Sequence, residues 1–309
     1  MSINSLKLNF NGLPDNVKGG FYLMFAAAGF GTMIALIKLL GENLHVAQIL
    51  LVRQAVMAII VAPTILRNFP GSLKTNSLGL QMLRIILALI AMSFGFTAVV
   101  NMPLADATAI GFAKSFFVTI CAIFFLDEVI GIRRWTAVII GFIGVLIVLR
   151  PGFDGFTIYG VYALIGAAGA GTVMVVIRIL TRSESPTTIL TYQALGVGLA
   201  VTIPGIWFWH WPSMLEWTLL VAMGLISYGA QMLNIIAYKY GEASVMASLD
   251  YVRLIYSVFF GWLLFETLPD VWTWLGALVI IGASIYTIHR EAQKKQVILR
   301  TAEGREKVS

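Results

Sequence analysis

Seven charged side chains stand inside long apolar stretches of this sequence, where an unpartnered charge is costly. They are Lys38, Arg53, Arg84, Lys114, Arg178, Asp250 and Arg253, and Asp106 stands at the mouth of a further stretch. A charge at the centre of a lipid bilayer costs roughly 3 kcal/mol or more, so such a residue normally faces a protein cavity and has a partner. These side chains are therefore the first candidates for binding a polar ligand.

Depth within the stretches separates these residues. Lys38 and Arg178 lie within about one helical turn of the ends of their stretches, so their long side chains can reach the headgroup region. We expect a structural role for both. Arg84 lies about two turns in from its end, and a structural role and a binding role both stay open.

The deepest charges form one group. Lys114, Asp250 and Arg253 lie near the middle of their stretches, and Arg53 lies about a third of the way in. Asp250 and Arg253 are three positions apart and share one helix face. In one interpretation, Asp250 pairs with Arg253 or Lys114 and locks helices together. In the other, these residues line a cavity and at least one base meets a substrate. The excess of deep bases over the one deep acid favours the second.

The same excess of bases predicts a substrate with a carboxylate or another anionic group, or a zwitterion whose cationic end meets Asp250. Tyrosines and amides near these positions would add ring faces and hydrogen bonds. The candidate substrate-binding residues are Arg53, Gln54, Lys114, Gln193, Tyr228, Gln231, Asn234, Asp250, Tyr251, Arg253 and Tyr256. Two nearby bases should keep Asp250 ionised near neutral pH, which favours uniport or exchange over proton coupling.

The composition requires that most of the chain be surrounded by lipid. Of its 309 residues, 59% are hydrophobic and only 12% are charged, whereas soluble domains have roughly 45–50% apolar and about 25% charged residues. The single cysteine, Cys121, rules out an internal disulfide. The sequence has no HExxH motif, no glycine-rich phosphate loop and no clustered carboxylates. We therefore expect no metal site, no cofactor and no enzymatic activity.

Apolar runs of membrane-spanning length recur along the chain. A bilayer core of about 30 Å needs roughly 20 apolar residues in a helix, and short breaks with glycine, proline or asparagine separate the runs. We predict ten transmembrane helices, near 19–40, 46–66, 78–100, 104–126, 133–150, 157–180, 187–209, 215–238, 243–265 and 271–289. Tryptophans at span ends should form interfacial belts, namely Trp207, Trp209, Trp211, Trp217 and Trp272.

The lysines and arginines predict the orientation of these spans. With the N-terminus inside, 14 of the 21 fall in cytoplasmic segments, six lie within spans, and Arg150 alone lies outside. Both termini are therefore expected in the cytoplasm. The net charge of +6 is explained by these flanks and gives no reason to expect nucleic-acid binding. The first 18 residues do not resemble a cleaved signal peptide, so the first span should act as the insertion signal.

The two halves of the chain resemble each other. Residues 20–40 and 160–180 are identical at nine of 21 aligned positions, including Tyr22/Tyr162, Gly29/Gly169, Gly31/Gly171 and Thr32/Thr172, and Lys38 is matched by Arg178. Further on, Glu128 matches Glu266 and Gly144 matches Gly282. Because each half has five spans, the second half should enter the membrane upside down. Such inverted repeats place a substrate site near the membrane midplane.

Several motifs make the chain resemble the drug/metabolite transporter superfamily, and within it the EamA-like family. They are the Ala-Asp-Ala-Thr-Ala segment at 105–109, the Phe-Phe-Leu-Asp-Glu run at 124–128, the helix at 135–144, and their counterparts at 241–244, 264–266 and 274–282. The resemblance covers about residues 20–289 and implies a ten-helix transporter with its cavity between the halves. Many members have a proline in the fourth helix where this chain has Ser115, preceded by Lys114, so a gating kink is not assumed here from the resemblance alone.

We therefore expect an all-α integral membrane protein that moves a small polar, anionic or zwitterionic metabolite across the inner membrane by alternating access. The alternatives are an exporter of amino acids or drugs and, outside transport, an integral-membrane lipid or prenyl transferase. The expected organisation is a cytoplasmic segment 1–18, five-helix repeats at 19–150 and 157–289, and a basic cytoplasmic tail 290–309. The expected partners are the metabolite and the lipid bilayer, with no nucleic acid, and a homodimer is left open.

Overall fold

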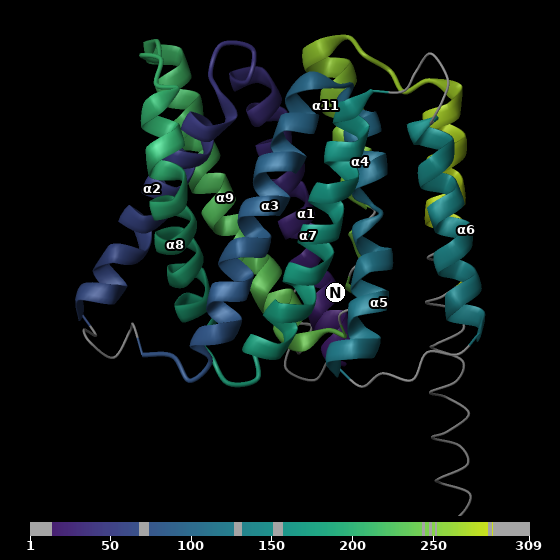
Figure 1. The fold of residues 1–309 in the computed structure, drawn as a ribbon, viewed down its shortest axis with the longest axis horizontal. Coiled ribbons are helices and arrows are strands. Elements are labelled where there is room, and N and C mark those ends of the chain that lie inside the picture. The colour runs from purple at the N-terminus through teal and green to yellow at the C-terminus, as the bar shows by residue number, and fades with distance from the viewer. Residues whose placement is uncertain are drawn as a thin grey trace, which may run out of the picture.

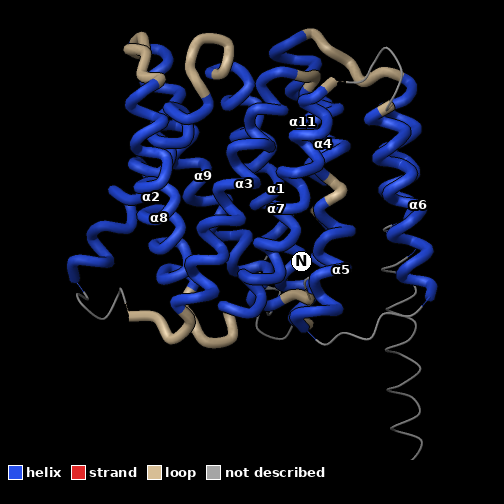
Figure 2. The backbone as a smooth tube through the Cα atoms, viewed as in Figure 1, coloured by secondary structure: helices blue, strands red, loops and turns tan. Residues whose placement is uncertain are grey.

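Helices make up almost all of the chain that the computed structural model describes, which is residues 14–67, 74–126, 132–150, 157–242, 245–246, 249–250, 252–283 and 286. In chain order they are α1 (Asp15–Leu40), α2 (Val46–Arg67), α3 (Leu78–Asn101), α4 (Leu104–Gly111), α5 (Lys114–Leu126), α6 (Ile132–Leu149), α7 (Ile158–Leu180), α8 (Pro186–Trp207), α9 (Met214–Tyr240) and α11 (Val252–Phe265). A final helix covers Val271–Ala283. The helices form one bundle (Figure 1), and the loops gather at its two ends (Figure 2).

The predicted spans are occupied by apolar helices. Seven are long and apolar enough to cross a membrane, at 15–40, 46–67, 78–101, 104–121, 158–180, 186–207 and 214–240. Three shorter apolar helices, at 139–149, 252–265 and 271–283, fall in the predicted fifth, ninth and tenth spans. Residues 284, 285 and 287–289 of the predicted tenth span lie outside the described residues, as do 243, 244, 247, 248 and 251 of the predicted ninth. The chain is thus an all-helical, multi-pass membrane protein.

The outside of the bundle is apolar, as contact with lipid requires. Large aliphatic side chains stand exposed along the outer faces of α2 and α8, among them Ile59, Leu199 and Ile203. In water such a surface would be unfavourable, whereas hydrocarbon solvates it at no cost. The helix contacts inside the bundle are also largely hydrophobic, and they enclose a smaller set of buried polar and charged side chains.

Local sequence signals explain where several helices begin. At α8, the side chain of Ser185 accepts a hydrogen bond from the main-chain N–H of Thr188 at 3.0 Å, and Pro186 occupies the first helical position. At α9, Ser213 and Glu216 form a reciprocal capping box: the Ser213 hydroxyl accepts from the Glu216 N–H, and the Glu216 carboxylate accepts from the Ser213 N–H. Both starts coincide with breaks predicted from proline, at Pro186 and Pro212.

The two sequence repeats make matching contacts with their neighbours. The most extensive helix contacts are α1 with α9 and α3 with α7. A Cβ atom placed on Gly29 of α1 would lie 2.9 Å from the Cβ of Ala230 in α9. One placed on Gly169 of α7 would lie 3.1 Å from the main-chain nitrogen of Ala91 in α3. The aligned glycines of the repeats therefore serve the same purpose, because each lets its helix approach a partner closely.

Lys38 and Arg178, which occupy matching positions in the two repeats, make the same kind of contact. The Lys38 ammonium donates to the carbonyl oxygens of Val99, Val100 and Met102, at the C-terminal end of α3. Arg178 donates to two carbonyl oxygens at the C-terminal end of α9, at 2.9 and 2.7 Å. The last carbonyls of a helix have no partner within it, and the dipole favours a cation there. The expected structural role is therefore filled by capping a neighbouring helix.

Candidate functional site

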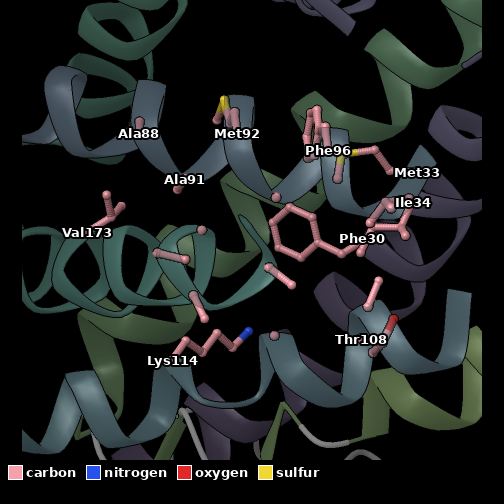
Figure 3. A pocket seen from close by; sticks show the side chains of 18 of the residues that line it. Phe30, Met33, Ile34, Ala88, Ala91, Met92, Phe96, Thr108, Lys114 and Val173 are labelled. Atoms are coloured by element: carbon pink, nitrogen blue, oxygen red, sulfur yellow. The ribbon is translucent and has the colours of Figure 1, made fainter. Parts of the chain in front are cut away.

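A cavity of about 180 Å³ lies among α1, α3, α4 and α7, with single side chains contributed by α2, α5, α8, α9 and α11 and by the turn at Phe112. Figure 3 shows Phe30 between the α3 side chains Ala88, Ala91, Met92 and Phe96 on one side and Lys114 on the other. Small residues of α3 and α7 leave the space open. Its polar lining consists of Arg53, Thr108, Lys114, Gln193, Gln231 and Arg253. Its large apolar lining includes three phenylalanines and three methionines, at 30, 96, 112, 33, 92 and 174.

The fourth span is interrupted beside this cavity. After α4 ends, Phe112 and Ala113 form a turn, and α5 begins at Lys114. The turn is held by bonds between residues three apart: the Ala113 N–H donates to Ile110 O at 2.9 Å, and the Ser115 N–H donates to Phe112 O at 3.0 Å. The Ser115 hydroxyl donates to the same Phe112 oxygen at 2.8 Å. Ser115 thus stabilises a break in a helical span that contains no proline, and Lys114 lies at the edge of this break.

Lys114, Asp250 and Arg253 form one buried ion cluster. The Lys114 ammonium pairs with Asp250 Oδ2, and Arg253 Nη2 donates to Asp250 Oδ1 at 2.8 Å. Asp250 is 2% exposed and does not itself line the cavity. The Arg253 guanidinium lies 4.6 Å from the ring centroid of Phe30, a cation–π contact that fixes its plane. The two interpretations of these residues are compatible, because the bases are paired and line the cavity as well.

Arg53 stands apart from that cluster. It is 1% exposed and lines the cavity from α2. Its Nη1 donates to Gln54 Oε1 at 2.9 Å and approaches the sulfur of Met92 at 3.5 Å. No carboxylate pairs with Arg53 among the described residues. A buried cation with only neutral partners is costly unless something else offsets its charge.

Arg84 lies behind the cavity wall and organises amides. It is fully buried but is not a lining residue. Its Nη1 donates to the main-chain oxygen of Ile189 at 3.0 Å, and its Nη2 donates to Gln193 Oε1. The same Oε1 accepts from Gln231 Nε2 at 3.0 Å. Gln54 Nε2 donates to the main-chain oxygen of Gln193 at 3.0 Å. The amides therefore connect Arg53 and Arg84 in one hydrogen-bonded network.

The candidate substrate-binding residues fall into three groups by their position relative to the cavity. Arg53, Lys114, Gln193, Gln231 and Arg253 line it. Asp250 and Gln54 are one hydrogen bond behind the lining. The remaining candidates that are described do not line it, namely Tyr228, Asn234 and Tyr256. Tyr251 lies outside the described residues.

Tyr256 and Asn234 have other contacts. The Tyr256 side chain packs against Gly31, where a Cβ atom would lie 2.6 Å from Tyr256 Cβ. The Asn234 amide approaches the sulfur of Met174 at 3.5 Å. Thr108 and the apolar lining residues were not predicted from the positions of the charged residues. The signal for Thr108 was the Ala-Asp-Ala-Thr-Ala segment, which was used only to recognise a family.

The described residues hold no group of three or more histidine, cysteine or acidic side chains that could bind a metal ion. The cavity offers cations, amides, one hydroxyl and apolar surface, which bind and orient a molecule. The arrangement is suited to holding an organic anion reversibly.

Comparison with known proteins identifies the family of the chain. The model of the EamA-like transporter family matches residues 17–150 and again residues 157–288. A riboflavin transporter of Brucella anthropi is 30% identical over 249 residues, which cover 77% of this chain and 87% of that protein. An S-adenosylmethionine uptake transporter of Rickettsia bellii is 28% identical over 276 residues, covering 88% and 93% of the two chains.

Two further matches extend the comparison. A pseudopaline exporter of Pseudomonas aeruginosa is 27% identical over 275 residues, covering 88% of this chain and 96% of that protein. A solved crystal structure with 15% sequence identity superimposes with a TM-score of 0.66 over 86% of this chain and 95% of that one, which shows a common fold. Since the family model matches both halves and covers most of the sequence, the chain belongs to the EamA-like transporter family.

Proposed function

We propose that this protein is a secondary transporter that moves a small anionic or zwitterionic metabolite across the inner membrane by alternating access. The observation that carries the proposal is the charge of the cavity. Three cationic side chains line it, Arg53, Lys114 and Arg253, and one carboxylate, Asp250, serves two of them. Three positive charges and one negative charge leave two positive charges for a substrate to offset.

Each base has a different part in binding. Lys114 and Arg253 are held by Asp250, so they present their remaining N–H donors from fixed positions, and little side-chain entropy is lost when a substrate binds. Arg53 has only neutral partners in the described chain and gains most from an anion. A carboxylate on the substrate therefore binds between the ion cluster and Arg53. Asp250 was expected to meet the cationic end of a zwitterion, but Lys114 and Arg253 lie between it and the cavity and occupy both of its oxygens.

The proposal of alternating access rests on the repeated construction. The α1–α9 and α3–α7 contacts, with their aligned glycines, support two five-helix halves at 19–150 and 157–289 that are inverted relative to each other. Inverted halves offer two equivalent packings around one central site, each open to a different side. The distribution of lysine and arginine supports cytoplasmic termini, including the segment 1–18 and the tail 290–309.

The relatives indicate a range of substrates and both directions of transport, and no single substrate. Their names include riboflavin, S-adenosylmethionine and pseudopaline, and both uptake and export. Alternating access serves either direction, so an exporter of amino acids or drugs is the alternative within the same mechanism. Because Asp250 accepts from two bases, exchange or uniport is favoured over proton coupling.

A ligand screen by thermal unfolding tests the proposal. The purified protein is heated with carboxylated, zwitterionic and cationic metabolites, and each variant is compared with its own ligand-free midpoint. We expect anions to raise the midpoint of the wild type. The shift should be lost in Arg253→Ala and in Lys114→Ala and retained in the control Arg182→Ala, whose side chain is exposed. Full stabilisation of both cavity variants would show that the anion binds elsewhere.

Proteoliposomes then test transport itself. A ligand found in the screen is loaded on one side, and its appearance on the other is followed with and without the same ligand in exchange. We expect flux in both directions, faster under exchange, and no stimulation by a proton gradient. Flux that requires a proton gradient and is lost in Asp250→Asn would overturn the assignment of uniport or exchange.

A further inference from the structure

The cavity holds a second kind of recognition group that the charged cluster does not explain. Gln193 is 1% exposed and lines the cavity from α8. Its Oε1 accepts two hydrogen bonds, whereas its Nε2 is buried without a hydrogen-bond partner in the described chain. A buried N–H donor without an acceptor is unfavourable, so this amide is held at a cost to the fold.

Arg84 fixes which way this amide points. A guanidinium can only donate hydrogen bonds, so the atom of Gln193 that faces Arg84 must be the oxygen. The Nε2 group is thereby directed away from Arg84. A second donor, Gln231 Nε2, bonds the same oxygen at 3.0 Å and prevents rotation of the amide. The cation on Oε1 also polarises the amide and makes its N–H groups stronger donors.

The amide and the ion cluster come from different helices. Gln193 belongs to α8 and Gln231 to α9, whereas Lys114 begins α5 and Arg253 belongs to α11. The lining also carries the rings of Phe30, Phe96 and Phe112 and the methionine side chains. Aromatic and thioether side chains of this kind suit a ring system that carries a charged and a neutral polar group.

We propose that Gln193 is a specificity-determining residue that donates a hydrogen bond to a neutral carbonyl group of the substrate, and that Arg84 is its positioning residue. The substrate class is then a planar, ring-containing carboxylate that also bears a carbonyl oxygen. This inference rests on the proposed function, since it assumes that the same cavity binds the substrate anion through Arg253 and Lys114.

A matched pair of probes isolates the carbonyl. 4-Acetylbenzoate and 4-ethylbenzoate share a ring and a carboxylate and differ by an oxygen in place of two hydrogens. Their affinities for the full-length protein in detergent are measured by calorimetry. One hydrogen bond to an otherwise unpartnered donor should make the wild type prefer the acetyl compound by about tenfold. In Gln193→Met the ratio of the two affinities should fall to about one, whatever the change in absolute affinity.

The positioning role of Arg84 predicts a change in selectivity rather than a general loss. In Arg84→Met the preference for 4-acetylbenzoate should shrink while the affinity for 4-ethylbenzoate is retained. The control is Gln81→Met, which alters another fully buried amide that is not a lining residue and should keep the tenfold preference. If Arg84→Met does not fold, the Gln193→Met measurement decides alone.

Each outcome separates this inference from the proposed function. Equal affinities in the wild type, no binding of either probe, or a preference that persists in Gln193→Met would overturn the inference. If Arg253→Ala no longer binds either probe, the anion site is supported, whatever the selectivity between the probes. Unchanged affinities in Arg253→Ala, with the preference still dependent on Gln193, would overturn the proposed anion site and leave the amide subsite standing.

Discussion

The shared carboxylate Asp250 gives the sharpest prediction about stability. Asp250→Asn keeps the shape of the side chain but removes the only charge that pairs with Lys114 and Arg253 in the described chain. Two buried cations are then left together without compensation. Lys114→Met is a milder change, because Asp250 keeps its bond to Arg253 and the methionine fills a similar volume. We therefore expect Asp250→Asn to destabilise the protein more than Lys114→Met does.

The magnitudes follow from the two bonds. Removing one partner of a buried ion pair costs about 3–5 kcal/mol, and Asp250 is the partner of two bases. The substituted asparagine would still offer one neutral oxygen to Arg253, so we expect Asp250→Asn to lose about 4 kcal/mol of unfolding free energy. Lys114→Met loses one charge-assisted bond and relieves the burial of a charge, so we expect a loss of about 1–2 kcal/mol.

Unfolding by SDS in mixed micelles, followed by tryptophan fluorescence, measures these free energies. The double variant Lys114→Met/Asp250→Asn leaves one unpaired cation instead of two, so its loss should be smaller than the sum of the single losses by about 1–2 kcal/mol. The control Ser227→Ala removes a buried hydroxyl that has no hydrogen-bond partner in the described chain and should change little. Equal losses in the two single variants, or strict additivity, would refute the reasoning.

Three further predictions concern packing, capping and charge at one end of the bundle. Gly166→Ala should destabilise the protein strongly, because a Cβ atom would lie 2.8 Å from a main-chain nitrogen of α3, whereas Gly229→Ala, with open space around it, should be neutral or slightly stabilising by the same micelle assay. Lys38→Met should lower the thermal midpoint, because three carbonyl groups at the end of α3 lose their donor, and Lys38→Arg should restore most of it. Burial opposes ionisation of Asp270, but hydrogen bonds from Thr273 and the charge of Arg150 lower its pKa below the ordinary value. The stability that its ion pair contributes is therefore present above the unfolded pKa and lost as pH falls through the folded pKa. Asp270→Asn should weaken the fall in thermal midpoint below about pH 4, and an unchanged acid profile would contradict this role.

The sequence predicted the helices well because lipid imposes a simple rule. Every span must be apolar and about 20 residues long, so composition alone located ten segments, and turn residues located most of their ends. The start of α1 at Asp15, four residues before the predicted position, shows the limit of this rule. A helix can continue beyond the bilayer into water, and hydropathy contains no information about where it stops.

Part of the cavity lining was also predictable, for a physical reason. Lys114 and Arg253 were recognised because charges in lipid are too costly to be accidental. Phe30 could not be recognised in the same way, since a phenylalanine in an apolar helix has the same composition whether it faces lipid, core or cavity. Arg84 shows a further limit. Its depth was clear from the sequence, but its role depends on Gln193, a residue 109 positions away.

The break in the fourth span forms here with Ser115 at the position where the resemblance to the family suggested a proline. Ser115 bonds back to Phe112 O and stabilises a turn that leaves Lys114 at the start of α5. A proline would lack the N–H that Ser115 donates to the same oxygen. The sequence could not predict this substitute, because serine is compatible with an intact helix as well as with a break.

The paired caps Lys38 and Arg178 have a consequence for the electrical behaviour of transport. Helices α1 and α7 end on opposite sides of the bundle (Figure 1), so one capping cation stands near each side. Each is bound to main-chain oxygens near its own end and moves with its own helices. Carrying one elementary charge through a 100 mV potential is worth about 2.3 kcal/mol. Cations held at the two ends do not make that crossing during a rocking motion. Any current recorded on a planar bilayer during turnover would therefore reflect the charge of the cargo and of the central cluster.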